Sequence, residues 1–321
     1  MREVTRKRLM VFAGSSHGEL GEEVATGIGV TLGGVEMSRF SNGEIYVRFL
    51  DSVRGVDAFV IQTCSEPVND NIMELLLMID ALKRASAKRI TAVMPYYGYS
   101  RQDKKTLARE PISAHLVADI ITAAGANRVL SLDLHAGQIQ GFFDFPLDHI
   151  TAMPLLASYI VQKNLKELVV VSPDAGRVKV AKRFSDKLRV PMAIMHKRRP
   201  EKNVAEIMNV IGEVEGKNAI LIDDMVDTAG TMVEAAAALK AAGALDIYAC
   251  VTHPILSGSA VERIELSDIK ELVVTNTLPV PPEKKIDKIT VLSIAPLLAN
   301  TITAVFKEES VSEIAGADNQ S

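Results

Sequence analysis

The chain contains no tryptophan and only two cysteines among its 321 residues. Because Cys64 and Cys250 lie far apart and each adjoins an apolar run, they form no metal-type spacing, and we expect buried free thiols. The net charge is −4, so the chain lacks an overall positive field that would attract nucleic acid. It also lacks an apolar run long enough to span a membrane, and residues 1–8 are basic and polar, unlike a signal peptide. These absences predict a cytoplasmic protein that binds neither nucleic acid nor membranes.

Short apolar runs that alternate with helical patterns are present along most of the chain. This alternation predicts an α/β fold built on a mainly parallel sheet. The length suffices for about two domains of ordinary size. We place the boundary at the helical segment that begins near residue 151, which gives an N-terminal domain of residues 1–150 and a C-terminal domain of residues 151–314. The last helix is a candidate to pack back on the N-terminal domain, and residues 315–321 are expected to fray.

The most informative stretch of the sequence runs from residue 219 to residue 231. It opens with a purely apolar run, which predicts a strand buried on both faces, and the run stops at two adjacent carboxylates, Asp223 and Asp224. Asp227 then opens a turn of small and hydroxyl residues, and an Ala-rich pattern after it predicts a helix over 232–242. The stretch is therefore a strand, a turn and the N-terminus of a helix.

Such a stretch suits a phosphate that lies beside a sugar. Unpaired N–H groups at a helix N-terminus and the hydroxyls of Thr228 and Thr231 can donate to a phosphate, and the helix dipole favours an anion there. Asp223 and Asp224 can accept hydrogen bonds from two sugar hydroxyls. Alternatively, Asp227 only caps the helix and the other two acids only end a strand. Two adjacent acids followed by Thr-Ala-Gly-Thr favour the site.

Three separate apolar runs end in an acid, namely Asp133, Asp174 and Asp223, and His135 follows the first of them. In open α/β sheets, ligands gather beyond the carboxyl ends of the strands. Carboxylates there suit Mg²⁺, which prefers oxygen ligands and substrate phosphates. The pattern predicts a magnesium-dependent site that holds phosphates.

Two further segments combine cations with aromatic or polar residues. In residues 96–105, three tyrosines and several cations could stack on RNA bases or equally hold a nucleotide triphosphate. In residues 196–203, five cationic or potentially cationic side chains fall within seven positions between two predicted strands. They could form a solvated surface or a flap that neutralises phosphates. A third segment, residues 38–44, is a tight turn with Asn-Gly before an alternating strand, which is typical of a hairpin.

These motifs together resemble the class I ribose-phosphate diphosphokinases. Residues 223–231 resemble the phosphoribosyl-diphosphate-binding motif, which type I phosphoribosyltransferases share. Residues 40–44, Phe-Ser-Asn-Gly-Glu, look like the adenine-contacting loop of the diphosphokinases, and residues 96–103 match their Tyr-Tyr-Gly-Tyr-x-Arg-Gln-Asp segment. The resemblance covers about residues 8–314. Position 177 is Arg where many relatives carry a second Gly, and we expect the turn to tolerate it.

The resemblance implies two similar α/β domains, each a mainly parallel sheet flanked by helices. It implies transfer of the diphosphoryl group of ATP to the anomeric hydroxyl of ribose 5-phosphate, with Mg²⁺. The implied catalytic residues are Lys197 and Arg199. The implied ATP contacts are Phe40, Asn42, Gly43, Glu44, Arg101, Gln102 and Asp103. The implied ribose 5-phosphate contacts are Arg199, Asp223, Asp224, Asp227, Thr228, Ala229, Gly230 and Thr231. The implied metal ligands are His135 and Asp174, with Asp133 as a weaker candidate.

The resemblance also implies regulation and assembly. It implies a homohexamer with a second anion site, for which Ser52, Arg54, Ser310, Val311 and Ser312 are the matching residues. Inorganic phosphate is the activator that it implies. Two rival readings are a phosphoribosyltransferase, which should lack the ATP loops, and a non-catalytic regulatory relative, which could lose the loop cations or His135. This chain keeps both sets of residues.

Overall fold

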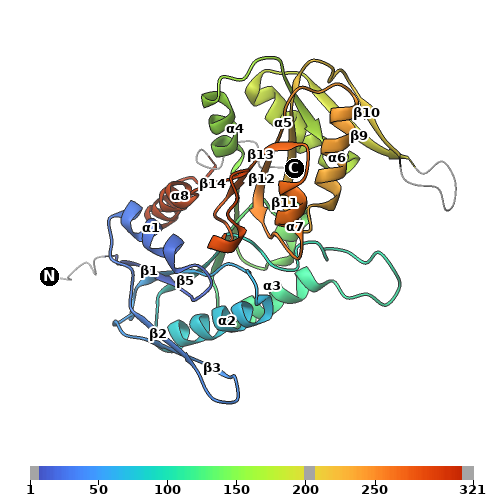
Figure 1. Ribbon diagram of the computed structural model, residues 1–321. Coiled ribbons are helices and arrows are strands. Elements are labelled where there is room, and N and C mark those ends of the chain that lie inside the picture. Colours follow the sequence, from blue (N-terminus) through green and yellow to red (C-terminus); the bar gives the residue numbers. More distant parts are fainter. Residues whose placement is uncertain (1–6, 199–206, 313–321) are drawn as a thin grey trace. The chain divides into compact units, whose positions relative to one another are not determined.

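The computed structural model describes residues 7–198 and 207–312, and it divides the chain into two α/β units (Figure 1). Unit 1 contains residues up to Thr151, together with Thr277–Pro279 and the segment from Ile294 onward. Unit 2 contains Ala152–Asn276 and Val280–Ser293. The segments predicted from the sequence, residues 1–150 and 151–314, are each continuous, whereas the units of the structure are not. The tail at 315–321 and Arg199 lie outside the described residues.

Unit 1 is built on a sheet of five strands in the order β1-β4-β5-β6-β7, and all neighbouring strands are parallel. The strands are β1 (Leu9–Ala13), β4 (Asp57–Ile61), β5 (Arg89–Met94), β6 (Arg128–Leu132) and β7 (Leu147–Ile150). Their continuous apolar runs arise because the sheet is covered on both faces. The helices are α1 (Gly18–Ile28), α2 (Val68–Arg84), α3 (Ser113–Ala124) and α8 (Ala295–Lys307), with the 3-10 turn η1 (Gly137–Phe142). Figure 1 shows α1 and α8 on one side of this sheet and α2 and α3 on the other.

A two-stranded hairpin extends from unit 1. It consists of β2 (Val35–Arg39) and β3 (Ile45–Phe49), which pair antiparallel. The turn uses Gly43 at φ +91°, a backbone conformation that glycine adopts readily. The hairpin predicted from Asn-Gly and strand alternation is therefore confirmed, and β3 has the predicted bounds.

Unit 2 is built on a sheet of seven strands in the order β10-β9-β8-β11-β12-β13-β14. Its neighbouring strands are parallel except for β10, which pairs antiparallel with β9. The strands are β8 (Leu168–Ser172), β9 (Met192–Arg198), β10 (Ile207–Ile211), β11 (Asn218–Val226), β12 (Ile247–Pro254), β13 (Ile269–Thr275) and β14 (Ile289–Leu292). The helices are α4 (Met153–Gln162), α5 (Val178–Leu188), α6 (Gly230–Ala241) and α7 (Ala260–Glu265), with 3-10 turns η2 (Ala175–Arg177) and η3 (Pro282–Lys284). The mainly parallel, helix-flanked sheets predicted for both halves are confirmed.

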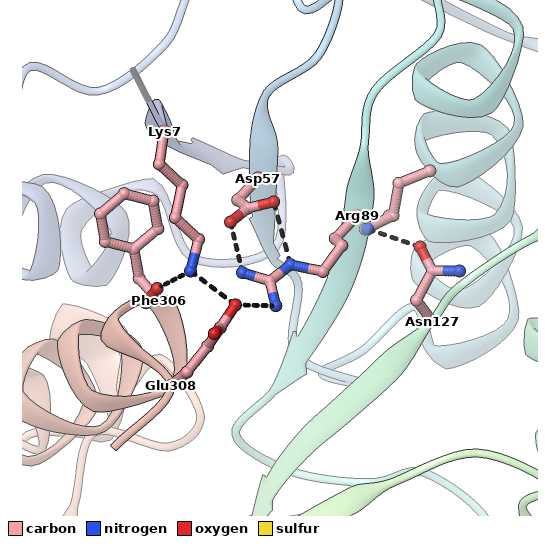
Figure 2. A network of polar contacts seen from close by, with 7 residues as sticks. Lys7, Asp57, Arg89, Asn127, Phe306 and Glu308 are labelled. Carbon is pink, nitrogen blue, oxygen red and sulfur yellow. Dashed lines mark hydrogen bonds and ion pairs between the residues drawn. The ribbon is translucent and has the colours of Figure 1, made fainter. Parts of the chain in front are cut away.

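At the amino ends of β4 and β5 in unit 1, four charged side chains form a network that we call the amino-edge cluster: Lys7, Asp57, Arg89 and Glu308 (Figure 2). Arg89 binds both oxygens of the buried Asp57, with Nε–Oδ1 at 3.0 Å and Nη2–Oδ2 at 2.5 Å, and Nη1 lies 3.3 Å from Glu308 Oε1. Lys7 Nζ donates to the same Glu308 oxygen at 2.9 Å. The cluster joins two cations to two carboxylates and so fastens the end of α8 to this sheet.

Among the helices of the described ranges, none combines the length and apolarity needed to cross a membrane.

Candidate active site

The paired carboxylates of unit 2 lie within a strand. β11 pairs with β8 only as far as Leu221, but its pairing with β12 continues through Asp223 to Val226. The sequence suggested that the strand stops before the acids, because a carboxylate is unusual in a buried run. The continued ladder with β12 corrects this. Asp223 and Asp224 thus lie at the carboxyl end of β11, at a level where β8 has already ended.

Arg177 contacts both of these acids, and we call the three residues the carboxyl-edge cluster. Its Nε lies 3.2 Å from Asp223 Oδ1 and its Nη2 lies 2.5 Å from Asp224 Oδ1. Its backbone has an ordinary φ of −98°, so the turn after Asp174 does not require a glycine at 177. The sequence marked Arg177 only as a departure from relatives. The sequence also contained a hint of this contact, because Arg177 is a cation that lies three residues after Asp174, one of the acids that follow a strand.

Burial, together with the neighbouring charge of Asp224 and a side-chain hydrogen bond with it, raises the pKa of Asp223 to about 8. The positive charge of Arg177 acts in the opposite direction. Because one guanidinium faces two adjacent carboxylates, the repulsion between the acids is only partly offset. The cluster therefore holds a proton more tightly than isolated aspartates would, and it can both donate and accept hydrogen bonds near neutral pH.

The turn after β11 leads directly into α6, which begins at Gly230, two residues earlier than predicted. The residue at the N-cap position, Ala229, has a left-handed backbone at φ +61° and no side chain that could cap the helix. Asp227 lies two residues before this position. Arg263 Nη1 donates to the Thr228 carbonyl at 2.9 Å and so fixes the turn. A helix N-terminus with nearby hydroxyls is an arrangement that binds phosphate in many proteins.

Lys197 lies at the penultimate position of β9, opposite Met208 of β10. Since β9 runs parallel to β8, Lys197 lies toward the carboxyl edge of the same sheet. The other catalytic candidate, Arg199, falls on the segment that the structure does not describe.

In unit 1 the predicted adenine loop is the tip of the β2–β3 hairpin. The amide of Phe40 donates to the Glu44 carbonyl at 2.9 Å, and the amide of Glu44 donates to Asn42 Oδ1 at 3.2 Å. Phe40 is 57% exposed, and its ring lies edge-on to Tyr46 at 6.1 Å between centroids. An exposed aromatic ring on a closed turn is available to contact a base.

The second predicted ATP segment, residues 96–103, is tied into unit 1. Tyr97 is buried and donates to the Ala114 carbonyl at 2.8 Å, so it cannot stack on RNA bases. Gln102 Oε1 accepts from Ser113 Oγ at 2.6 Å, and the buried Asp103 accepts from Gln138. Arg101 is exposed next to these anchored residues. The segment is therefore a fixed loop with one cation at its surface, which favours a phosphate contact over an RNA platform.

The predicted metal ligands come from both units. Asp133 and His135 follow β6 in unit 1, and Asp174 follows β8 in unit 2, where its Oδ1 accepts from the amide of Arg177 at 3.0 Å. Across the described ranges, no group of three or more His, Cys, Asp or Glu side chains is arranged to hold a metal. His149, which the sequence did not single out, accepts the Leu134 amide at 2.9 Å through Nε2 and so fixes the loop that carries His135.

The predicted regulatory residues of unit 1 flank the amino-edge cluster in sequence. Ser52 and Arg54 are exposed in the loop before Asp57. Ser310 and Ser312 follow Glu308, and the Ser312 amide donates to Ser310 Oγ at 3.3 Å. Arg89 contacts both Asp57 and Glu308, so it links the residue that follows the first segment to the residue that precedes the second.

The two cysteines of the chain are both buried and free, as predicted. Burial raises the pKa of the Cys64 thiol to about 12 and also raises the pKa of Cys250. Neither is suited to act as a nucleophile or a metal ligand.

Comparison with known proteins gives the family of this chain. Residues 9–125 match the family model described as the N-terminal domain of ribose phosphate pyrophosphokinase, and residues 199–315 match the phosphoribosyl synthetase-associated domain. A ribose-phosphate pyrophosphokinase from Oceanobacillus iheyensis is 58% identical over 304 residues, and one from Bacillus cereus is 57% identical over 304 residues. Each alignment covers 95% of this chain and 96% of the relative.

A solved structure gives the same result. The phosphoribosylpyrophosphate synthetase of Mycobacterium smegmatis superposes with a TM-score of 0.90 at 51% identity, covering 94% of this chain and all of that one. On the strength of its sequence, its fold and its motifs, this chain belongs to the ribose-phosphate pyrophosphokinase family, the ribose-phosphate diphosphokinases.

Proposed function

We propose that this chain transfers the diphosphoryl group of ATP to the anomeric hydroxyl of ribose 5-phosphate, giving 5-phosphoribosyl 1-diphosphate and AMP for nucleotide biosynthesis. The observation that carries the proposal is the end of β11, where Asp223 and Asp224 are followed by the N-terminus of α6. The names of the relatives, and the presence of both ATP segments in unit 1, support the same reaction.

Ribose 5-phosphate binds in unit 2 in this proposal. Asp223 and Asp224 hydrogen-bond the ribose hydroxyls, and the segment from Asp227 to Thr231 holds the 5-phosphate. Two amides of the first turn of α6, those of Gly230 and Thr231, have no carbonyl four residues earlier within the helix. The hydroxyls of Thr228 and Thr231 add donors. The sugar is thereby fixed at both ends, which orients its anomeric hydroxyl.

ATP binds through unit 1 in this proposal. The exposed ring of Phe40 and the closed turn of Asn42, Gly43 and Glu44 contact the adenine. Arg101 contacts the phosphates. Gln102 and Asp103, which Ser113 and Gln138 hold in place, keep this loop in position for the nucleotide.

Mg²⁺ with the ATP phosphates fits the donor set of this chain, because the candidate ligands are the oxygens of Asp174 and Asp133 and the imidazole of His135. When bound, Mg²⁺ neutralises phosphate charge and orients the diphosphoryl group. Lys197 and Arg199 stabilise the negative charge on the diphosphoryl group as it passes to the sugar. Catalysis is then positioning and electrostatics without a covalent enzyme intermediate.

The test is a single incubation of the purified chain with ATP, ribose 5-phosphate and Mg²⁺, followed by separation of the nucleotides. Formation of AMP that depends on both substrates and is abolished by excess chelator is expected. A phosphoribosyltransferase would form no AMP from this mixture, and a non-catalytic relative would leave ATP unchanged. Either outcome would overturn the proposed function.

We also propose that the chain forms a homohexamer and is activated by inorganic phosphate at a second anion site made by Ser52, Arg54 and Ser310–Ser312. The hydroxyls and the guanidinium supply the donors that such a site needs. Arg54→Ala should blunt both activation by phosphate and inhibition by ADP, with AMP formation as the readout. Responses equal to those of the parent would exclude Arg54. The mass in solution, measured by light scattering, tests the hexamer.

A further inference from the structure

We infer that Arg177 is a positioning residue for the ribose hydroxyls, one that holds Asp223 and Asp224 in the arrangement that receives the sugar. This inference rests on the proposed function, because it assigns the sugar to these two carboxylates. The side chain of Arg177 is only 14% exposed. A largely buried guanidinium that contacts two carboxylates is not an ordinary solvent-exposed cation, and its position points to a specific role.

The backbone delivers Arg177 to this position. Asp174 follows β8, and its Oδ1 accepts the amide of Arg177, which fixes the short turn η2 before α5 begins. β8 and β11 are neighbours, and β8 ends several residues before β11 does. The side chain of Arg177 therefore meets β11 at the level of the acids.

The two contacts restrain both carboxylates at once. Successive strand residues point to opposite faces, so Asp223 and Asp224 would not share a partner on one face of the sheet. A guanidinium offers several donors in a rigid plane, and here Nε meets one acid while Nη2 meets the other. Both contacts use Oδ1 oxygens, and the amide of Asp224 also donates to Asp223 Oδ1 at 2.8 Å.

The charges of the carboxyl-edge cluster also favour a positioning role for Arg177. Two adjacent and largely buried carboxylates repel each other, and a proton relieves that repulsion. A carboxylate that gains a proton loses an acceptor for a sugar hydroxyl and is free to rotate. Arg177 counters this with a positive charge that cannot be lost at ordinary pH. Removing it should therefore weaken binding of the sugar, while the ATP segments in unit 1 are unchanged.

The test compares Arg177→Gln, Arg177→Lys and, as a matched control, Lys179→Gln, which removes a positive charge from the exposed surface of α5, the helix that begins directly after Arg177. Charge-assisted hydrogen bonds contribute enough that Arg177→Gln should raise the KM for ribose 5-phosphate by ~10-fold or more. The KM for ATP should stay within about twofold of the parent value, since a purely structural defect would affect both substrates. Arg177→Lys keeps the charge but not the two-pronged contact, so its KM for ribose 5-phosphate should lie between those of the parent and the Gln variant.

Calorimetric titration of ribose 5-phosphate without ATP gives the second readout, and the dissociation constant should rise in parallel with KM. A KM for ribose 5-phosphate that is unchanged or lower in Arg177→Gln would overturn the inference, as would an equal rise in Lys179→Gln. If Arg177→Gln does not fold, the Lys variant must still show a raised KM. A parent protein that forms no AMP would overturn the proposed function instead, so the two failures are distinct.

Discussion

The two arginine clusters of this protein contain similar groups but differ in balance. In the amino-edge cluster, two cations meet two carboxylates, and Arg89 matches both oxygens of Asp57 (Figure 2). In the carboxyl-edge cluster, one guanidinium is shared between two adjacent aspartates. Hydrogen bonds and the charges of Lys7 and Arg89 lower the pKa of Glu308, whereas burial beside Asp224 raises that of Asp223.

This difference separates an anchor from a binding site. A matched set of charges has little to gain from a further partner, and it lies at the amino ends of strands, where α/β sheets rarely bind ligands. The two carboxylates that Arg177 contacts lie instead at the carboxyl end of β11, next to the N-terminus of α6, which is where α/β sheets usually bind ligands. We therefore expect changes at the amino edge of unit 1 to alter stability and changes at the carboxyl edge of unit 2 to alter activity.

The largest effect is expected for Lys197→Ala, at the carboxyl end of β9. If Lys197 acts on the diphosphoryl group only during transfer, kcat should fall on the order of 100-fold to 1,000-fold. The KM values and the melting temperature should change little. Steady-state kinetics and a thermal melt measure these quantities, and Lys187→Ala on the exposed face of α5 is the control. A raised KM with kcat intact would show that Lys197 only assists binding.

A smaller effect, on stability alone, is expected for Asp57→Asn at the amino edge. Asp57 is 2% exposed, and its loss leaves the Arg89 guanidinium without its matched partner. We expect a loss of about 2 kcal/mol in the free energy of unfolding. The ratio kcat/KM should stay within about twofold. Urea unfolding and kinetics measure the two.

The control for that prediction is Asp80→Asn, which breaks an exposed pair with Arg84 one turn along α2. Such surface pairs contribute about 0.5 kcal/mol or less. If Asp57→Asn lowers activity as strongly as stability, the amino edge is not merely an anchor and the contrast between the clusters fails.

The smallest expected effect is the pH dependence of stability caused by Asp223. Because its pKa in the folded protein is raised from the ordinary value to about 8, the folded state holds the proton longer than the unfolded state does. The stability that this supplies is complete below the ordinary pKa of an aspartate and is lost as the pH rises through 8. The Asn side chain of Asp223→Asn does not titrate, so the melting temperature of this variant should rise relative to that of the parent between about pH 5 and about pH 8.

Differential scanning calorimetry at the two pH values measures this shift. Asp186→Asn, which alters an exposed carboxylate on α5, should show no such trend. A constant difference between Asp223→Asn and the parent across the range would mean that Asp223 titrates normally. The charge of Asp223 would then be as well balanced by its neighbours as that of Asp57, and the two clusters would not differ in charge balance.

Much of this fold follows from local sequence pattern. The apolar runs at 9–13 and 45–49 are strands β1 and β3 with those bounds, because alternation or burial of a short run leaves little choice. The ends of elements follow less well. Proline favours the first turn of a helix, which would place the start of α3 at Pro111, but α3 begins at Ser113, and the Ala114 amide donates to the Gln102 carbonyl. Contacts between distant segments decide where a helix or strand begins and ends, and the sequence pattern within one segment does not reveal those contacts.

The candidate site shows the same division. The types of residue at Asp223, Asp224 and Thr228–Thr231 indicated a ribose phosphate site, because their chemistry is local. The contact of Arg177 with both acids depends on β8 ending before β11, which is a property of strand register. His149 supports the loop after β6 only because β7 lies beside β6. Neither partner could be found without the pairing of distant strands.

The return of the chain to unit 1 has a consequence for synthesis on the ribosome. Helix α8, which belongs to unit 1, packs against α1 so closely that a methyl group placed on Gly27 would lie 3.1 Å from Ala299 Cβ. These helices are the first and the last to be translated. Unit 1 therefore remains incomplete until nearly the whole chain has emerged, although domains usually fold in the order of synthesis. A nascent chain that stops before residue 294 exposes the face of α1 that α8 covers, which makes truncated products of this protein targets for chaperones and proteases.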